Sequence, residues 1–228
     1  MSGIPVITID GPGGSGKGTI SRMLAQELGW HFLDSGSLYR LVALGALKHN
    51  IPLTDETALA EYAQGLDVRF ESLEPESEPH IWLENQQVDS EIRTEQCGNA
   101  ASKVASLPKV REALLQRQRD FLEAPGLVAD GRDMGSTVFP HASLKIYLTA
   151  SAEVRAERRH KQLKEKGIDV NLAALVKDIT ERDERDTNRA VSPLKPAKDA
   201  VIVDTSQMDI SEVMSRVREL AQQLASEN

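Results

Sequence analysis

The fold of this chain is decided by residues 6–19, which read VITIDGPGGSGKGT. The first four residues are apolar and β-rich, which predicts a short buried strand that ends at Asp10 and Gly11. Beyond the glycines, apolar side chains recur at helical spacing at Ile20, Met23, Leu24 and Leu28. This spacing predicts a helix that begins near Lys17, so the stretch is a strand, a glycine-rich turn and a helix in succession.

The glycine-rich turn has the pattern G-x-x-x-x-G-K, which is typical of loops that bind phosphate. Glycines allow successive backbone N–H groups to point inward around an anion, and the helix that follows directs its positive dipole end toward the same anion. The side chain of Lys17 adds a mobile charge for the terminal phosphates. We therefore predict that ATP binds to Gly11, Pro12, Gly13, Gly14, Ser15, Gly16, Lys17, Gly18 and Thr19.

The residue after Lys17 departs from the usual pattern, because it is Gly18 rather than serine or threonine. The nearest hydroxyl comes one residue later, at Thr19. No direct ligand to Mg²⁺ is therefore assigned, and we expect Thr19 or Asp130 to hold the metal through water. Asp130 is the stronger carboxylate candidate because it ends a predicted strand, whereas Asp10 can simply fix the turn of the loop.

Further apolar runs have the length of strands, at 30–33, 127–129, 144–148 and 200–203. Helical patterns separate them, at 38–47, 110–121, 172–179 and 210–220. Strands that alternate with helices predict a parallel sheet with helices on both faces. Together with the first strand, these runs predict an α/β fold with a five-stranded parallel sheet.

One stretch, residues 62–102, breaks this alternation. It is acidic and contains the sequence EPESEP at 74–79. On either side of that sequence, residues 68–70 and 80–83 alternate in polarity as the two strands of a hairpin do. We predict a small β-containing insertion here, and an irregular surface excursion is the alternative.

Composition and charge exclude several classes of protein. The chain has 228 residues, of which 40% are hydrophobic and 27% charged, as is usual for a protein with a buried core. Its net charge of −8 argues against general affinity for nucleic acid or anionic membrane. No apolar run approaches the roughly 20 residues of a membrane span, and no signal peptide is expected. Because Cys97 is the only cysteine, we expect a reducing, cytoplasmic location, and we expect a monomer.

Four motifs in this order resemble those of bacterial cytidylate kinases, which are nucleoside monophosphate kinases. They are GPGGSGKGT at 11–19, LDSGSLYR at 33–40, ADGRDMG at 129–135 and ERDERDTNR at 181–189. The likeness runs along nearly the whole chain. It implies an enzyme that uses ATP and Mg²⁺ to phosphorylate CMP, and dCMP as well, to the diphosphate.

The same resemblance implies a division of the chain. Residues 62–102 resemble the enlarged nucleotide-binding subdomain of the family, inserted into a phosphate-loop core of 1–61 and 103–228. Within that core, the polar segment 155–167 resembles a short lid that carries Arg158 and Arg159 over ATP. Closure of such a lid excludes water, which otherwise competes as a phosphoryl acceptor.

Phosphoryl transfer requires positioned cations more than covalent help from the protein. Arginine suits this role because its planar guanidinium binds phosphate through two N–H groups. Arg40 and Arg132 stand out because each follows the carboxyl end of a predicted strand, where ligands of open α/β sheets bind. For the other arginines, a surface ion pair is the commoner explanation. The residues assigned to the reaction itself are Lys17, Arg132, Arg158, Arg182 and Arg185.

The charged segment 181–189 permits a geometric argument. At 100° per residue on a helix, Arg182, Asp186 and Arg189 fall within about 60° of one another. This stripe roughly continues the apolar face of residues 172–179, and a charge on a core-facing side is costly unless it is paired or holds a ligand. A ladder of i,i+4 ion pairs is the alternative.

The resemblance also implies which residues bind CMP. Its phosphate is assigned to Ser35, Arg40 and Arg132, its ribose to Arg182, Asp186 and Arg189, and its base to Ser102, Arg111 and Asp133. Asp130 is also assigned to the CMP site. The assignment is chemically consistent, because cytosine offers an amino donor to a carboxylate and ring acceptors to arginine and serine.

Other functions stay open at this point. A kinase of UMP, or of a small non-nucleotide metabolite on the same fold, is the alternative within enzymes. A nucleotide-dependent switch belongs to another class, and a GTPase would carry an N-K-x-D motif that this sequence lacks.

Overall fold

The computed structural model describes residues 3–71, 80–165 and 167–226. The chain forms two compact units. One combines Met1–Leu33 with Phe121–Asn228, and the other is Asp34–Asp120. The EPESEP sequence at 74–79 lies outside the described residues.

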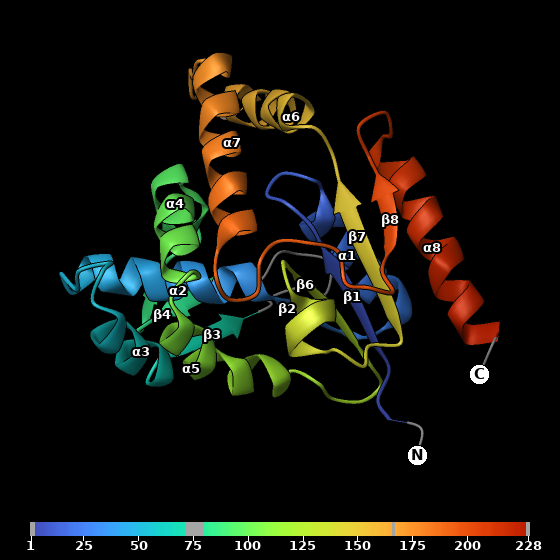
Figure 1. The fold of residues 1–228 in the computed structure, drawn as a ribbon, viewed down its shortest axis with the longest axis horizontal. Coiled ribbons are helices and arrows are strands. Elements are labelled where there is room, and N and C mark those ends of the chain that lie inside the picture. The colour runs from blue at the N-terminus through green and yellow to red at the C-terminus, as the bar shows by residue number, and fades with distance from the viewer. Residues whose placement is uncertain (1–2, 72–79, 166, 227–228) are drawn as a thin grey trace. The chain divides into compact units, whose positions relative to one another are not determined.

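The first unit is built on a five-stranded parallel sheet with the order β2-β6-β1-β7-β8 (Figure 1). The strands are β1 (Val6–Asp10), β2 (His31–Asp34), β6 (Leu127–Gly131), β7 (Leu144–Thr149) and β8 (Val201–Asp204). The predicted fold class is therefore confirmed. The second predicted strand is shifted by one residue, because β2 begins at His31 and Trp30 precedes it. The indole ring of Trp30 packs over Gly126, and a Cβ added to Gly126 would lie 2.4 Å from that ring.

The register of the sheet brings three polar loops to one edge. β1 lies in the middle, with Ile9 opposite Asp130 of β6 and Asp10 opposite Tyr147 of β7. Since the strands are parallel, their carboxyl ends meet at the same edge, where open α/β sheets bind ligands. The loop that follows β1 begins at this edge with Gly11.

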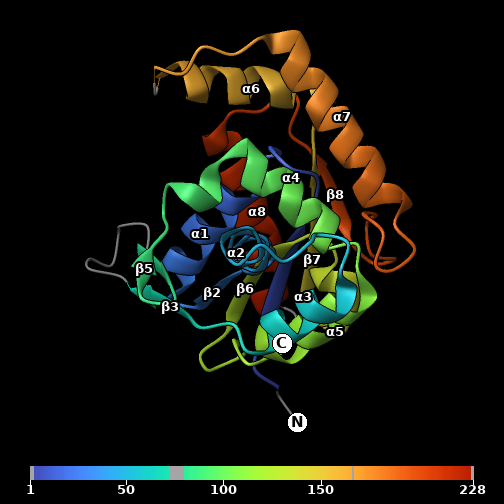
Figure 2. The same ribbon diagram turned by 90° about the vertical axis from the view of Figure 1, so that its left-hand side faces the viewer.

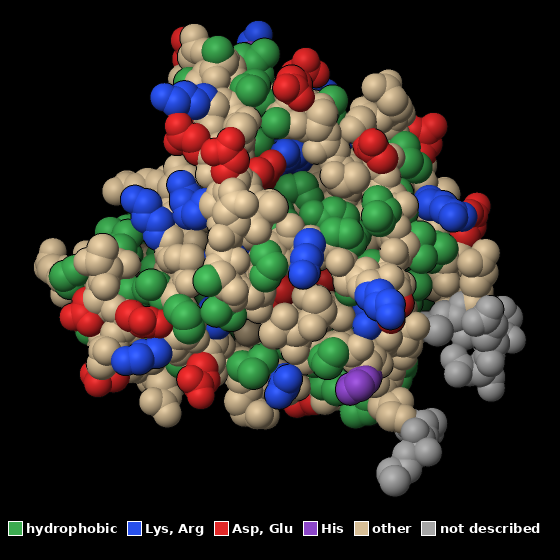
Figure 3. Space-filling model, viewed as in Figure 1, with side chains coloured by type: hydrophobic (Ala, Val, Ile, Leu, Met, Phe, Trp, Pro, Cys, Tyr) green, Lys and Arg blue, Asp and Glu red, His purple; other side chains and the backbone are tan. Residues whose placement is uncertain are grey.

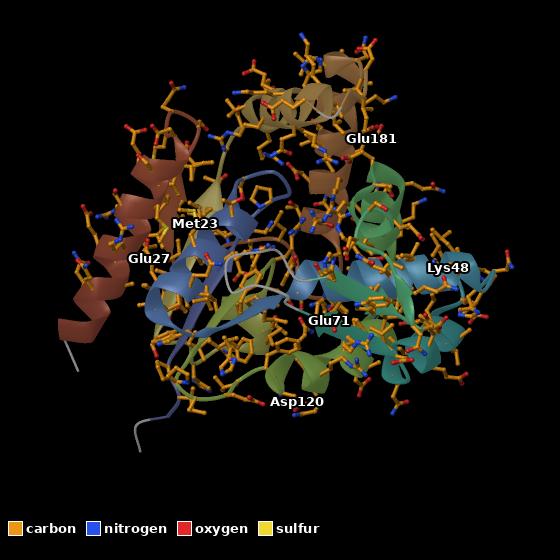
Figure 4. The ribbon with its side chains drawn as sticks, turned by 180° about the vertical axis from the view of Figure 1, so that it is seen from behind. Met23, Glu27, Lys48, Glu71, Asp120 and Glu181 are labelled. Carbon is orange, nitrogen blue, oxygen red and sulfur yellow. The ribbon has the colours of Figure 1, made fainter. Side chains whose placement is uncertain are left out.

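One face of the sheet is covered by α1 (Lys17–Leu28) and α8 (Ile210–Ser226), as Figure 1 shows. Both helices contribute apolar side chains to a core with alternate strand residues, among them Ile7, Ile9, Leu24, Ile146, Leu148, Met214 and Val217. Glu27 of α1, labelled in Figure 4, pairs with Arg218 of α8 at 2.7 Å. This packing anchors α1, whose first turn follows directly on the glycine-rich loop.

Along β1, Thr8 and Asp10 alternate with Ile7 and Ile9. The side chains of Thr8 and Asp10 contact η2 (Met134–Val138), a single turn of wide π-type helix. Gly135 in this turn approaches the strand closely, since an added Cβ would lie 2.7 Å from Thr8 Oγ1. The turn therefore needs glycine at this point.

The helices α6 (Ala152–Glu165) and α7 (Leu172–Asn188) meet at an angle at the top of Figure 2. They pack through a small apolar cluster of Ala156, Leu163 and Leu175. The predicted lid, 155–167, covers most of α6 and includes residue 166, which lies outside the described residues. Its role as a lid stays a prediction.

The second unit is mainly helical, with α2 (Ser35–Lys48), α3 (Glu56–Gln64), η1 (Glu91–Arg93), α4 (Glu95–Val104) and α5 (Pro108–Arg119). α2 packs against α4, and α3 packs against α5. Asp34 caps α2, because its carboxylate accepts a hydrogen bond from the Ser37 N–H at 3.0 Å. Most of α2 is buried, which explains its nearly continuous apolar sequence.

The unit also holds an antiparallel sheet of β3 (Val68–Glu71), β4 (His80–Leu83) and β5 (Gln86–Gln87). The predicted hairpin is confirmed, with Phe70 paired to Ile81. The short β5 was not predicted, because two exposed glutamines carry no strand pattern. The predicted insertion, 62–102, lies within Asp34–Asp120, and its standing as a separate subdomain remains a prediction.

Charged side chains of both signs are interspersed on the face drawn in Figure 3. Among the helices of the described ranges, none combines the length and the apolar character that crossing a membrane requires.

Candidate active site

The loop Gly11–Thr19 joins β1 to α1, so the predicted strand, loop and helix are confirmed. Gly14 and Gly16 have φ angles of 81° and 89°, in the left-handed region. Side chains disfavour this region, which explains why glycine occupies both positions. The loop therefore has the backbone conformation that a phosphate-binding nest requires.

Lys17 is the first residue of α1 and is 9% exposed. Its Nζ donates a hydrogen bond to the carbonyl oxygen of Pro12 at 3.3 Å and lies 3.8 Å from Oδ1 of Asp130. The ammonium group therefore lies between the start of the loop and the carboxylate near the end of β6.

Two arginines from distant parts of the sequence border Gly13 in the loop. An added Cβ at Gly13 would lie 3.4 Å from Nη2 of Arg132 and 3.7 Å from Cζ of Arg182. Arg132 follows β6, and Arg182 lies on α7. With Lys17 they make three positive side chains around one glycine-rich loop, an arrangement that suits a polyphosphate.

Arg132 is held in place by Asp186. The Nε of Arg132 donates to Oδ2 of Asp186 at 2.8 Å, and Asp186 is buried. Burial opposes the charge on Arg132, but the Asp186 carboxylate outweighs it and holds the pKa of Arg132 above its ordinary value. Arg132 is therefore charged throughout the physiological range.

Arg189 and Asp133 form a second buried contact, with 3.8 Å between Nη2 and Oδ1. The prediction that Arg189 lies on the helix is wrong by one residue, because α7 ends at Asn188 and Arg189 has extended backbone. The chain turns here because the carbonyl of Asp186 accepts the N–H of Leu194. Arg189 Nε donates to the carbonyl of Ser192, which fixes this turn.

Asp10 joins the end of β1 to the segment that carries Arg132 and Asp133. Its carboxylate accepts hydrogen bonds from the N–H groups of Met134 and Gly135, both at 2.8 Å. Burial raises the pKa of Asp10 to about 6, although these two donors act to lower it. Asp10 therefore fixes η2, whereas the sequence had associated it only with the turn of the glycine-rich loop.

Arg158, predicted to contact ATP, donates to the carbonyl oxygens of Thr205 at 2.6 Å and Met208 at 3.3 Å. The structure thus places it against the segment that follows β8. Arg159 lies 3.4 Å from Oε1 of Gln162 on the same helix. Arg185 is half-buried on α7. The roles of all three toward ATP stay predictions.

The other predicted residues belong to the second unit. Ser35, at the start of α2, donates to Oε1 of Gln118 at 2.7 Å. Arg40 lies one turn further along α2, and its Nη1 donates to the carbonyls of Ile92 at 2.5 Å and Thr94 at 3.3 Å. These hydrogen bonds hold the Arg40 guanidinium against η1 and the start of α4.

The two residues predicted to read the base in this unit lie on neighbouring helices. Arg111 of α5 is 7% exposed, donates to the carbonyl of Ala105 at 3.2 Å and has its guanidinium carbon 5.6 Å from the centroid of the Tyr39 ring. Ser102 of α4 is 4% exposed. Asp133 belongs to the first unit.

The sequence reasoning missed Arg155 as an individual residue. It is 3% exposed, and its Nη1 donates to the carbonyl of Gly13 at 2.9 Å. The same guanidinium forms an ion pair with Asp183 of α7. The available signal was its position in the first turns of the helix after β7, near the carboxyl edge of the sheet.

The residues named for a metal are partly suited to it. An added Cβ at Gly18 would lie 3.2 Å from Oδ2 of Asp130, so this carboxylate lies beside the loop residue that precedes Thr19. Thr19 is exposed. Within the described part of the chain, no three His, Cys, Asp or Glu side chains are grouped as metal ligands. A carboxylate that acts together with substrate phosphates is a common arrangement for Mg²⁺.

Comparison with known proteins identifies the family. The family model described as "Cytidylate kinase" matches residues 7–223. A cytidylate kinase from Shewanella denitrificans is 59% identical over 94% of this chain and 95% of its own length, and one from Pseudomonas entomophila is 60% identical over 94% of each. The crystal structure of TT1252 from Thermus thermophilus matches with a TM-score of 0.50 and 16% identity, covering 97% of this chain and 98% of that one, which supports the fold alone. This chain belongs to the cytidylate kinase family.

Proposed function

We propose that this chain transfers the terminal phosphoryl group of ATP to CMP, and to dCMP, and forms the nucleoside diphosphate and ADP. The observation that carries the proposal is the set of cations around the glycine-rich loop, with Arg132 and Arg182 against Gly13 and Lys17 at the start of α1. The family to which the chain belongs supports the choice of acceptor.

ATP is proposed to bind with its phosphates in the loop Gly11–Thr19. The backbone N–H groups and the amino end of α1 would accept the negative charge. Lys17 would contact the terminal phosphates, and its ion pair with Asp130 keeps the ammonium close to the loop. Arg158 and Arg159 would help to cover the nucleotide as part of a lid over 155–167.

CMP is proposed to contact residues of both units. Those in the second unit are Ser35, Arg40, Ser102 and Arg111, and those in the first are Asp130, Arg132, Asp133, Arg182, Asp186 and Arg189. Phosphate would be bound by Ser35, Arg40 and Arg132, which combine two guanidinium groups with a hydroxyl. The predicted subdomain over 62–102 is proposed to belong to this acceptor site.

The chemical step requires an oxygen of the CMP phosphate to attack the terminal phosphorus of ATP while the bond to the bridging oxygen of ADP breaks. Charge builds on the transferred group and on the leaving oxygen, and fixed guanidinium groups stabilise that charge. Arg132 is suited to this because Asp186 orients it, and Arg182 because it approaches Gly13. We propose that Arg185 assists them.

Magnesium bound with ATP would neutralise phosphate charge and help to align the reacting groups. The position of Asp130 beside Gly18 supports it as the residue that holds the metal through water, with Thr19 as the second candidate. Asp10 is unsuited, because both of its oxygens accept backbone N–H groups.

The test is an ADP-release assay with purified protein, MgATP and each of CMP, dCMP, UMP, AMP and GMP. CMP and dCMP are expected to give the highest kcat/KM. Turnover with UMP at least equal to that with CMP would favour the UMP alternative, and the absence of nucleotide-dependent ADP release would reject the proposal. A nucleotide-dependent switch would release ADP without any acceptor.

A further inference from the structure

Arg155 makes contacts on three sides that no step of the proposed reaction uses. Its Nε donates to the carbonyl of Ala150 at 2.9 Å, its Nη1 to the carbonyl of Gly13 at 2.9 Å, and both Nη1 and Nη2 face the carboxylate of Asp183. The side chain is 3% exposed. Through one planar guanidinium, the end of β7, the glycine-rich loop and α7 are therefore joined inside the first unit.

The stem of Arg155 also packs on the loop. An added Cβ at Gly14 would lie 3.3 Å from Cβ of Arg155 and 3.7 Å from its Cγ. Gly14 has a φ of 81°, so both its backbone conformation and its contact with Arg155 favour glycine. The stem and the guanidinium thus contact two consecutive loop residues.

The hydrogen bond to Gly13 fixes the orientation of one peptide group. The carbonyl of Gly13 and the N–H of Gly14 belong to the same trans peptide, in which the two groups point in opposite directions. Because Arg155 holds the carbonyl on its own side, the Gly14 N–H points away from Arg155. A glycine–glycine peptide otherwise reorients easily, since neither residue has a Cβ to restrict it.

Asp183 extends this constraint to α7. It directly follows Arg182 in the sequence. The guanidinium of Arg182 borders Gly13, on the side where a Cβ of residue 13 would project. The ion pair of Arg155 with Asp183 therefore sets the position of the helical turn that carries Arg182. The same pair neutralises a guanidinium that would otherwise be buried without a counter-charge.

We propose that Arg155 is a positioning residue for ATP, which holds the Gly13–Gly14 peptide with its N–H available to the phosphates and keeps Arg182 beside the loop. The proposal rests on the proposed function for the identity of the donor. Arg155 itself does not contact the reacting atoms. Its effect is on the backbone donors of the loop, so it should act on ATP binding much more than on the acceptor.

The first measurement is the equilibrium affinity for ATP and ADP by calorimetry, without CMP, for the wild type and for Arg155→Lys and Arg155→Met. Loss of one hydrogen bond to a charged phosphate corresponds to a loss of affinity of roughly tenfold or more. Both variants are expected to show it, because lysine keeps the charge but lacks the planar fork that reaches Gly13, Ala150 and Asp183 together.

The matched control is Arg218→Met, which removes the arginine of another ion pair in the same unit, the one with Glu27 on α1. Its affinity for ATP is expected to equal that of the wild type. Circular dichroism and thermal unfolding establish that each variant is folded. If Arg155→Met does not fold, Arg155→Lys, which leaves the buried charge paired, carries the test.

Steady-state kinetics provide the second measurement. The KM for ATP should rise by about the factor seen in calorimetry, and by more than the KM for CMP, because Arg155 bonds directly to the loop and reaches the proposed acceptor residues of α7 only through Asp183. A folded Arg155→Lys variant with wild-type affinity for ATP would overturn the proposal, because charge alone would then suffice. Equal increases in both KM values would overturn it too, since that is the pattern of a general structural loss.

Different results would reject the proposed function and the role of Arg155. If the wild type binds ATP but gives no CMP-dependent ADP release, the proposed function is rejected, while the calorimetric comparison still decides the role of Arg155. If the wild type phosphorylates CMP and the variants bind ATP normally, only the role of Arg155 is rejected.

Discussion

The Nε of Arg132 lies 2.8 Å from Oδ2 of Asp186, which joins the segment after β6 to the last turns of α7. The carboxylate side chain is only 4% exposed. Removing one partner of such a pair leaves the other charge buried without compensation. The pair therefore contributes both to the stability of the first unit and to the orientation of Arg132.

We expect Asp186→Asn to lower the free energy of unfolding by roughly 1–3 kcal/mol, because the amide keeps the shape but loses the charge. Urea-induced unfolding measures this. Glu219→Gln is the control, since its pair with Arg216 is exposed and should change stability by less than about 0.5 kcal/mol. Equal effects from the two substitutions would contradict a special role for the buried pair.

Lys17→Met is expected to reduce kcat by roughly a hundredfold or more with the fold retained, since it would remove the charge that is proposed to contact the transferred phosphoryl group. Methionine is similar in length to lysine and can fill the same buried position, so the variant is expected to stay folded, which thermal unfolding checks. Initial rates at saturating ATP and CMP provide the measurement. Turnover within a few-fold of the wild type would disprove the role of Lys17.

Arg111→Met is expected to raise the KM for CMP at least about tenfold and to leave the KM for ATP nearly unchanged, because one charged hydrogen bond to the base would be lost. Arg111 lies over Tyr39 within the second unit, whereas the glycine-rich loop belongs to the first. Lys103→Met, an exposed residue of the neighbouring α4, serves as the control.

Asp133→Ala tests the second proposed base reader, which lies in the first unit. It should likewise raise the KM for CMP and spare that for ATP, because it would remove the carboxylate that is proposed to accept the amino group of cytosine. Discrimination between CMP and UMP should fall with it, since UMP lacks that amino group. Equal losses for both substrates would count against this assignment.

Asp10 predicts a specific dependence of stability on pH. Burial raises its pKa from 3.8 to about 6, so between these values the folded protein holds a proton that the unfolded chain has released. The contribution of Asp10 to the free energy of unfolding therefore falls as the pH rises from about 4 to above 6. Relative to Asp10→Asn, the wild type should gain up to about 3 kcal/mol between pH 7 and pH 4.

Denaturant unfolding of both proteins at several pH values measures this difference, and the comparison cancels the titration of other groups. A difference that stays constant over this pH range, or that changes in the opposite direction, would show that burial does not dominate at Asp10.

The parallel sheet could be predicted because its signals are local. Residues 6–19 carry an apolar run, glycines and a helical pattern in immediate succession, and the structure confirms each. The hairpin around Phe70 and Ile81 was equally visible from alternation in polarity. In contrast, α6 has few apolar residues, and the sequence showed it only as a polar segment.

The contacts of the site were much less predictable, because they join residues far apart in the chain. Nothing in the sequence near Asp10 indicates that it accepts the N–H groups of Met134 and Gly135. Arg155 was missed for the same reason, since its partners Gly13 and Asp183 are separated from it by a whole unit or by a helix. Arg189 lies just beyond the end of α7, and its side-chain Nε donates to the carbonyl of Ser192 in the turn that follows, a contact that helical periodicity does not indicate.

The hydrogen bond between Ser35 and Gln118 has a consequence for the modular construction of the chain. Asp34–Asp120 is a continuous segment, and these two buried residues lie just inside its first and last positions. The hydrogen bond thus joins the two ends of the segment. A segment of this kind is suited to transplantation or circular permutation, because its removal leaves two chain ends that a short linker can reconnect.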